Sequence, residues 1–180
     1  MRVADLTPYP GIGEVIPVSH QAELIRIIKS EPFKGYAFFG PSGCGKSHLL
    51  HCLLQEAILT GKDVFFSKMA QLLRVIRENE FGRLPEERWD EIIDADDLKN
   101  RKQGKPLHIF IDEIDKISIT DDVYLKFLEL VDFIYENQES AVLNVCSNLS
   151  PDKFAEIWGE AVLRRIEHVS SAIVMIKAEA

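Results

Sequence analysis

Eight consecutive residues, Gly40–Ser47, form the pattern Gly-x-x-x-x-Gly-Lys-Ser between an apolar segment and a segment of helical periodicity. Glycines let such a loop turn tightly enough to aim successive backbone N–H groups at one anion, and the start of the next helix adds a positive dipole end. In this setting Lys46 would reach the β- and γ-phosphates of a nucleotide, and the Ser47 hydroxyl would ligate Mg²⁺. The motif therefore predicts a site for a nucleoside triphosphate. The residues expected to contact it are Gly40, Pro41, Ser42, Gly43, Cys44, Gly45, Lys46, Ser47 and His48.

Two carboxylates, Asp112 and Glu113, follow the apolar run 107–111, which predicts a strand buried on both faces. An acidic residue at the carboxyl end of a strand beside a phosphate loop can hold Mg²⁺ through its water shell, and we expect Asp112 to do so. Glu113 is placed to accept a proton from an attacking water molecule. A solvated acidic turn would also explain this composition, because Asp115 follows closely. The phosphate loop earlier in the chain favours the catalytic interpretation.

A carboxamide, Asn148, follows the expected fourth strand at residues 141–146. At the carboxyl edge of the sheet it would lie between the metal-binding strand and the phosphate loop. There it could hydrogen-bond the γ-phosphate or orient the water. An Asn before Leu-Ser-Pro is also a common turn residue. We assign Asn148 to the site because of its position at this edge.

Two consecutive arginines, Arg164 and Arg165, lie in a segment with helical periodicity. Consecutive helical residues project about 100° apart, so only one of them can serve a given site. A guanidinium that reaches the γ-phosphate bound by a neighbouring subunit would stabilise the charge of the transition state. The alternative is a pair of surface arginines near Glu160 and Glu167. The residues alone leave both interpretations open.

Predicted strands alternate with predicted helices along the chain. The strands are expected at residues 36–39, 63–67, 107–111, 141–146 and 172–176. The helices are expected at about 20–29, 47–59, from 69 onward, 86–95, 122–136, from 150 onward and 160–167. This alternation predicts an α/β fold in which a five-stranded parallel sheet lies in a three-layer α/β/α arrangement. We expect one domain over residues 1–180, with an irregular lead-in at 1–19 where proline and glycine are frequent.

The charge balance is acidic, with 29 acidic and 21 basic residues, so any contact with nucleic acid must come from a local patch. Basic residues gather before the third strand, although such a run is usually a solvated loop. They are Lys99, Arg101, Lys102 and Lys105. The three cysteines lack a metal-binding spacing, which favours reduced thiols in an intracellular protein. No signal peptide or membrane-spanning run is visible, so we expect a cytoplasmic protein with no membrane partner.

Together the motifs resemble those of the AAA+ ATPases, and within them the replicative helicase loaders and the ATPase helpers of insertion-sequence transposases. The resemblance covers roughly residues 20–177, and its main segments are 40–50, 61–66, 71–74, 109–113 and 147–148. It implies a Walker A role for Gly40–Ser47, a Walker B role for Asp112 and Glu113, and a sensor 1 role for Asn148. Residues 161–168 are similar to the arginine-finger helix, in which Arg165 matches best. ATP and Mg²⁺ are then the implied cofactors. The implied partners are further copies of the chain, joined through a trans arginine, a helicase or transposase, and DNA as a further candidate.

The chain departs from that group in three respects. Four residues follow the expected fifth strand, so we expect no helical lid that carries a second sensor. We also expect no amino-terminal partner-binding domain, and the net charge is acidic, whereas the relatives usually act on DNA. These departures weaken the expectation of strong autonomous ATPase activity and leave the expectation of nucleotide binding unchanged.

The leading functional hypothesis is an ATPase that oligomerises with ATP and assists DNA replication or transposition by loading or recruiting another protein. A small-molecule or nucleotide kinase shares the phosphate loop, but the Asp-Glu pair and the lack of an arginine-rich acceptor lid oppose it. A transporter-type ATPase is excluded because the signature Leu-Ser-Gly-Gly-Gln is missing. A nucleotide-gated adaptor with little turnover stays open, since Glu113 opposes it and the missing lid favours it.

Overall fold

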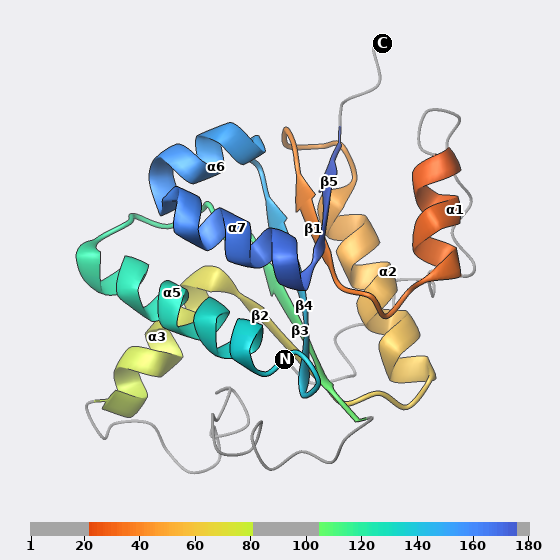
Figure 1. Ribbon diagram of the computed structural model, residues 1–180, viewed down its shortest axis with the longest axis horizontal. Helices are drawn as coiled ribbons and strands as arrows, with labels where there is room; N and C mark the ends of the chain where they lie inside the picture. The colour runs from red at the N-terminus through yellow and green to blue at the C-terminus, as the bar shows by residue number, and fades with distance from the viewer. Residues whose placement is uncertain (1–21, 81–104, 176–180) are drawn as a thin grey trace.

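The computed structural model describes residues 22–80 and 105–175, which contain a five-stranded sheet with every strand pairing parallel (Figure 1). The strands are β1 (Tyr36–Phe39), β2 (Val64–Lys68), β3 (Leu107–Asp112), β4 (Ala141–Ser147) and β5 (Ser171–Val174). Their order in the sheet is β2-β3-β4-β1-β5. The predicted parallel α/β fold is confirmed. The lead-in at residues 1–19 and the helix expected at 86–95 lie outside the described residues.

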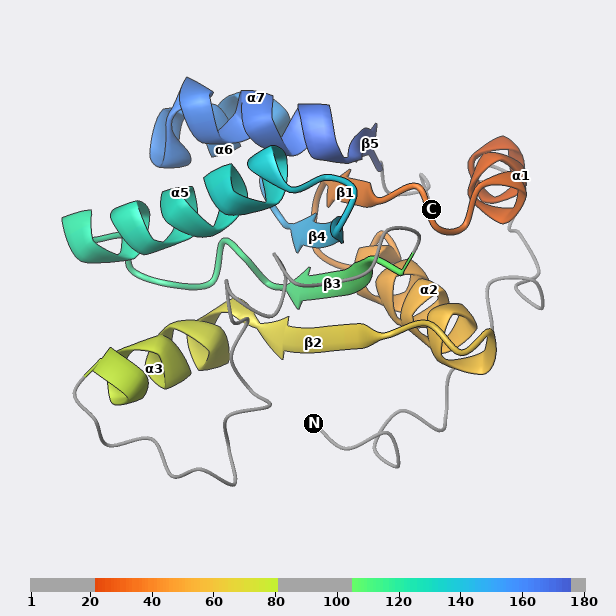
Figure 2. The same cartoon turned by 60° about the horizontal axis from the view of Figure 1, so that its bottom comes forward.

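Helices cover both faces of the sheet and make three layers (Figure 2). The helices are α1 (Ala22–Ser30), α2 (Lys46–Leu59), α3 (Met69–Glu80), α5 (Asp121–Glu136), α6 (Pro151–Trp158) and α7 (Glu160–Val169). One face packs against α1 and α2, and the other packs against α3, α5, α6 and α7. No separate helical lid occurs within the described residues.

Strand β1, which lies between β4 and β5, shows how alternate residues of one strand contribute to the two cores. All four of its residues are buried, and side chains alternate between the faces of a strand. Tyr36 and Phe38 therefore join the core beneath α1 and α2, whereas Ala37 and Phe39 join the core beneath α5, α6 and α7. Phe39 packs edge to face with Phe154 of α6 at 5.5 Å between ring centroids. Burial on both faces explains why β1 is uniformly apolar.

The observed ends of the elements differ from the expected ones by a few residues. Helix α2 begins at Lys46, because Gly45 takes the capping position with φ of 96°. Strand β2 continues to Lys68, one residue beyond the prediction. Helix α6 is capped by Ser150, whose side chain accepts a hydrogen bond from the backbone N–H of Lys153. In the part of the chain described, no helix is long and apolar enough to cross a membrane.

His108 near the start of β3 generates a prediction about pH and stability. The side chain is 2% exposed and packs against the Phe33 ring. Burial, and then the positive charge of Lys62, lower the pKa of His108 to about 4, although Asp63 acts in the opposite direction. An unfolded histidine has a pKa near 6.5, so between pH 6.5 and about pH 4 the unfolded chain binds more protons than the folded protein does. The free energy of unfolding should fall by up to about 3 kcal/mol as pH drops through this window.

His108→Gln, which does not titrate, should remove this part of the pH dependence. Urea unfolding at pH 7 and pH 5 would measure it, and the difference between the two pH values should be smaller in the variant than in the wild type. His168→Gln changes an exposed histidine on α7 and should keep the wild-type difference. An unchanged difference in the His108 variant would contradict the prediction.

Candidate functional site

A cavity of about 300 Å³ lies where β1, β3 and β4 end. Its walls come from three segments: the glycine loop after β1, the end of β3 and the end of β4. Because β4 lies between β1 and β3 in the sheet, Asn148 lies between the loop and Asp112, as its position in the sequence predicted. Parallel strands bring their carboxyl ends to one edge, and this edge is the usual binding crevice of open α/β sheets.

The glycine loop has a backbone that side chains would obstruct. Gly40, Gly43 and Gly45 have φ of 140°, 82° and 96°. A Cβ on Gly40 would lie 2.1 Å from the carbonyl oxygen of Met175, just after β5. Helix α2 starts at the end of this loop with no side-chain cap and no acidic residue in its first turn. Its first N–H groups and positive dipole end are therefore free to bind an anion.

Lys46 is the cation of the loop and is 5% exposed. Its ammonium donates a hydrogen bond of 2.8 Å to the carbonyl oxygen of Pro41 and lines the cavity. Among the described carboxylates, none forms an ion pair with it. A buried ammonium is costly without a negative partner, so this cation favours an anionic ligand in the cavity.

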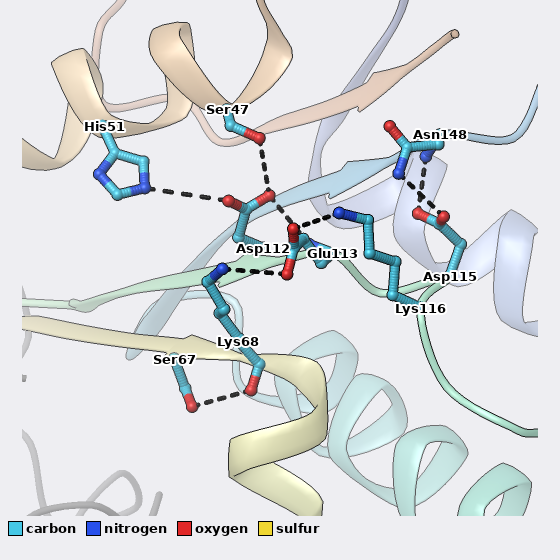
Figure 3. A network of polar contacts seen from close by, with 9 residues as sticks. All are labelled: Ser47, His51, Ser67, Lys68, Asp112, Glu113, Asp115, Lys116 and Asn148. Atoms are coloured by element: carbon cyan, nitrogen blue, oxygen red, sulfur yellow. Dashed lines mark hydrogen bonds and ion pairs between the residues drawn. The ribbon is translucent and has the colours of Figure 1, made fainter. Parts of the chain in front are cut away.

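Ser47 and Asp112 both line the cavity and contact each other (Figure 3). The Ser47 hydroxyl donates to Asp112 Oδ1 at 3.1 Å, and His51 Nε2 lies 3.9 Å from Asp112 Oδ2. A hydroxyl and one carboxylate suit Mg²⁺, which takes hard oxygen ligands and is usually held by one or two carboxylates together with substrate phosphates. The described residues contain no cluster of three or more side chains that could form a closed metal cage. The oxygen atoms present therefore fit a magnesium ion shared with a nucleotide.

Asp112 is 4% exposed, and its ionisation depends on its hydrogen bonds. Burial alone would raise the pKa of Asp112. The nearby His51, together with hydrogen bonds from the Ser47 hydroxyl and the backbone N–H of Glu113, outweighs burial and lowers this pKa below its ordinary value. Asp112 is therefore a carboxylate at neutral pH, as a metal ligand must be.

Glu113 is held between two lysines (Figure 3). Its carboxylate forms ion pairs with Lys116 and, at 3.1 Å, with Lys68 at the end of β2. The hydrogen bond from Lys116 lowers the pKa of Glu113 most, burial acts against it, and Lys68 lowers it further. Glu113 also has φ of 58°, a left-handed conformation that is uncommon outside glycine and is concentrated at functional sites.

Asn148 makes two hydrogen bonds to one carboxylate. Its backbone N–H donates to Asp115 Oδ1 at 2.6 Å, and its side-chain Nδ2 donates to Asp115 Oδ2 at 3.0 Å. Asn148 also lines the cavity. The carboxamide is thus present where it was expected, with a partner that was not expected.

The two arginines lie on α7 and do not line the cavity. Arg165 forms an ion pair with Asp132 of α5 and donates to the carbonyl oxygen of Ala161. Arg164 is more exposed and lies 3.6 Å from Glu160. Neither arginine can complete this site from within the same chain, so the trans role of Arg165 stays a prediction.

Four residues of the site were not assigned a role from the sequence: His51, Lys68, Asp115 and Lys116. His51 follows Ser47 by four residues, so helical spacing places both side chains on one face of α2. Lys68 pairs in register with Asp112 in the neighbouring strand, which becomes evident only once the strand order is known. Asp115 stood out only as part of an acidic turn.

Comparisons with known proteins agree with this geometry. Residues 30–180 match the family model of the IstB-like ATP binding protein. A search of curated proteins finds no match. Solved structures with similar folds include AMPPCP-bound DnaA from Aquifex aeolicus, with a TM-score of 0.68 and 16% identity over 94% of this chain and 51% of that one. The DnaC helicase loader has a TM-score of 0.64 and 19% identity over 92% and 96% of the two chains, and DnaI has 0.65 and 17% over 99% and 93%.

The chain spans about half the length of the two AMPPCP-bound DnaA structures that it matches. At these identities the structural likeness shows the AAA+ fold and nothing finer. The family model, in contrast, covers most of the sequence, including the glycine loop and the acidic pair. The chain therefore belongs to the IstB-like ATP-binding protein family and has the AAA+ type of fold.

Proposed function

We propose that this protein binds ATP with Mg²⁺ and hydrolyses it to ADP and phosphate in a homo-oligomer that assists DNA replication or transposition. The observation that carries the proposal is the meeting of Lys46, Ser47, Asp112 and Glu113 around one cavity. Each has the chemistry that its position requires: a phosphate-binding cation, two oxygen ligands and a general base.

Different residues of the chain would have different roles in hydrolysis. The glycine loop and Lys46 would hold the phosphates, and Ser47 with Asp112 would hold Mg²⁺, which supplies positive charge to the β- and γ-phosphate oxygens. A water oxygen would attack the γ-phosphorus while the bond from that phosphorus to the ADP oxygen breaks. Glu113 would take the proton from the water, and Asn148 would hold the water or the γ-phosphate in line.

The positions of the arginines support the proposed oligomer. The transition state of phosphoryl transfer gathers charge on the γ-phosphate oxygens, and an arginine supplied by another subunit is a common way to neutralise it. We assign this role to Arg165, which lies on the surface of α7. The role in DNA replication or transposition rests on family membership and on the fold shared with DnaC and DnaI.

A second candidate is an adaptor that binds ATP and turns it over barely at all. The ion pairs of Glu113 with Lys68 and Lys116 favour it, because a carboxylate engaged by two ammonium groups is a weaker base. Measured turnover distinguishes the two candidates.

Glu113→Gln should abolish hydrolysis and spare ATP binding, because the amide keeps the shape of the side chain and cannot accept the proton. The turnover number should fall by about 10²- to 10⁴-fold. Phosphate release and the affinity for fluorescent ATP would be measured with excess Mg²⁺. Glu156→Gln, an exposed change on α6, should behave as wild type. A wild-type rate no higher than that of Glu113→Gln would favour the adaptor.

A mixing experiment tests the trans arginine. Arg165→Ala and Glu113→Gln should each be inactive alone. In a mixed oligomer, an Arg165→Ala subunit keeps its own Glu113 and can receive Arg165 from a Glu113→Gln neighbour. A 1:1 mixture should recover activity at about a quarter of the interfaces, as random assembly of heterologous contacts requires. Arg164→Ala is the matched control and should remain active alone, whereas failure to recover activity in the mixture would argue against Arg165.

Nucleotide-dependent assembly is the third expectation. The mass of Glu113→Gln should rise above that of the monomer with ATP and Mg²⁺ and should not rise with ADP, because the γ-phosphate bridges subunits. Mass photometry with single-stranded DNA, double-stranded DNA and no DNA would measure it. Lys46→Ala should stay monomeric throughout, since it loses the phosphate-binding cation. A monomer of Glu113→Gln in every condition would remove the oligomeric part of the proposal.

A further inference from the structure

Asp115 binds Asn148 with both of its carboxylate oxygens, and both residues are partly buried (Figure 3). One oxygen accepts from the backbone N–H and the other accepts from the side-chain amide. Two hydrogen bonds to a carboxylate fix both the position of the Asn148 backbone and the rotamer of its side chain.

The chemistry of these groups also fixes which way the carboxamide faces. An ionised carboxylate only accepts hydrogen bonds, so the NH₂ group of Asn148 must face Asp115 and Oδ1 must point away from it. One N–H of the NH₂ group is used by Asp115, and the second remains available. Asn148 can therefore offer one acceptor and one donor to a ligand in the cavity.

Asp115 lies in the same tight turn as Glu113. The turn is closed by the backbone N–H of Lys116, which donates to the carbonyl oxygen of Glu113 at 3.1 Å. The N–H of Ile114 donates to the carbonyl oxygen of Cys146 in β4, also at 3.1 Å. The turn is thus bonded to β4 and its end through Ile114 and through Asp115. A displacement of Asn148 is transmitted directly to the turn that carries Glu113.

Building on the function proposed above, we propose that Asp115 is a positioning residue for ATP hydrolysis. It orients the Asn148 carboxamide so that Oδ1 accepts a hydrogen bond from the attacking water and the second N–H donates to the γ-phosphate. It also joins this contact to the turn that holds Glu113. The loss of Asp115 would then weaken the binding only of nucleotides that have a γ-phosphate.

A purely structural role for Asp115 has different consequences. If the carboxylate only closed the turn, its loss would weaken ADP and ATP binding alike or lower the stability of the protein. Its effect would also be independent of the Asn148 side chain. A double-mutant cycle separates the two roles, because residues that act through one contact give non-additive effects.

The test compares wild type, Asp115→Asn, Asn148→Ala and the double variant. Asp115→Asn keeps the size of the side chain and leaves one acceptor oxygen where there were two. Turnover, the affinities for ADP and for the β,γ-methylene analogue of ATP, and the thermal midpoint of unfolding would be measured for each. Turnover should fall by about 10- to 100-fold in each single variant, the loss typical of a misplaced catalytic contact.

The ADP affinity should stay within about twofold of wild type, while the preference for the ATP analogue over ADP should be lost, because only the γ-phosphate contact depends on Asp115. The double variant should be no slower than the slower single variant. Asp115→Glu keeps both acceptor oxygens and should recover part of the turnover. Asp121→Asn, an exposed change at the start of α5, is the matched control and should match wild type in all measurements.

The inference would be overturned if the fold-loss of turnover in the double variant equalled the product of the losses in the two single variants. It would also be overturned if Asp115→Asn weakened the binding of ADP and of the ATP analogue equally. Absence of hydrolysis by the wild-type protein would contradict the proposed function instead. In that case the preference for the ATP analogue over ADP still decides the role of Asp115, since it is a binding measurement. A lost preference in Asp115→Asn would support the inference, and a retained preference would refute it.

Discussion

The site depends on the hydrogen bond between Ser47 and Asp112, which joins elements that are not neighbours in the sheet. Ser47 follows β1 and Asp112 ends β3, and β4 lies between these strands. Adjacent strands are about 4.8 Å apart, so β1 and β3 are separated by about 10 Å, and Ser47 must lie well to one side of β1 to reach Asp112. It does so because α2 leans across the sheet and packs its buried face on Phe110 of β3 and Cys146 of β4. The apolar face of α2 therefore determines where the hydroxyl lies.

Charge is unequally distributed around the cavity, and this determines what can bind there. The loop contributes a buried ammonium and an uncapped helix start, whereas the strand end contributes the carboxylates of Asp112 and Glu113. A bare phosphate near both carboxylates would be repelled. A phosphate that carries a divalent cation can interact with the cationic loop through its oxygens and with the carboxylates through the metal. The site therefore suits a metal–nucleotide complex better than either component alone.

The parts of the site that lie within single motifs could be predicted from the sequence. Lys46 and Ser47 follow from the glycine pattern, and Asp112 follows from its place at the end of a buried strand. The partners of these residues could not be predicted in the same way. Lys68 reaches Glu113 only because β2 pairs with β3, and Asp132 reaches Arg165 only because α5 packs beside α7. Such pairs depend on tertiary packing, which a pattern of residue types along one chain does not specify.

Arg165 is paired with Asp132, so the trans role proposed for this arginine requires that it first leave that carboxylate. The ion pair lies near the surface and is about one-third exposed, so it contributes less than about 1 kcal/mol. A triphosphate with bound metal offers several oxygens to a guanidinium and can replace a single carboxylate at little cost. Asp132 belongs to α5, whose start at Asp121 follows soon after the turn containing Glu113 and Asp115. The Arg165–Asp132 pair therefore joins α7 to the helix that begins soon after this turn.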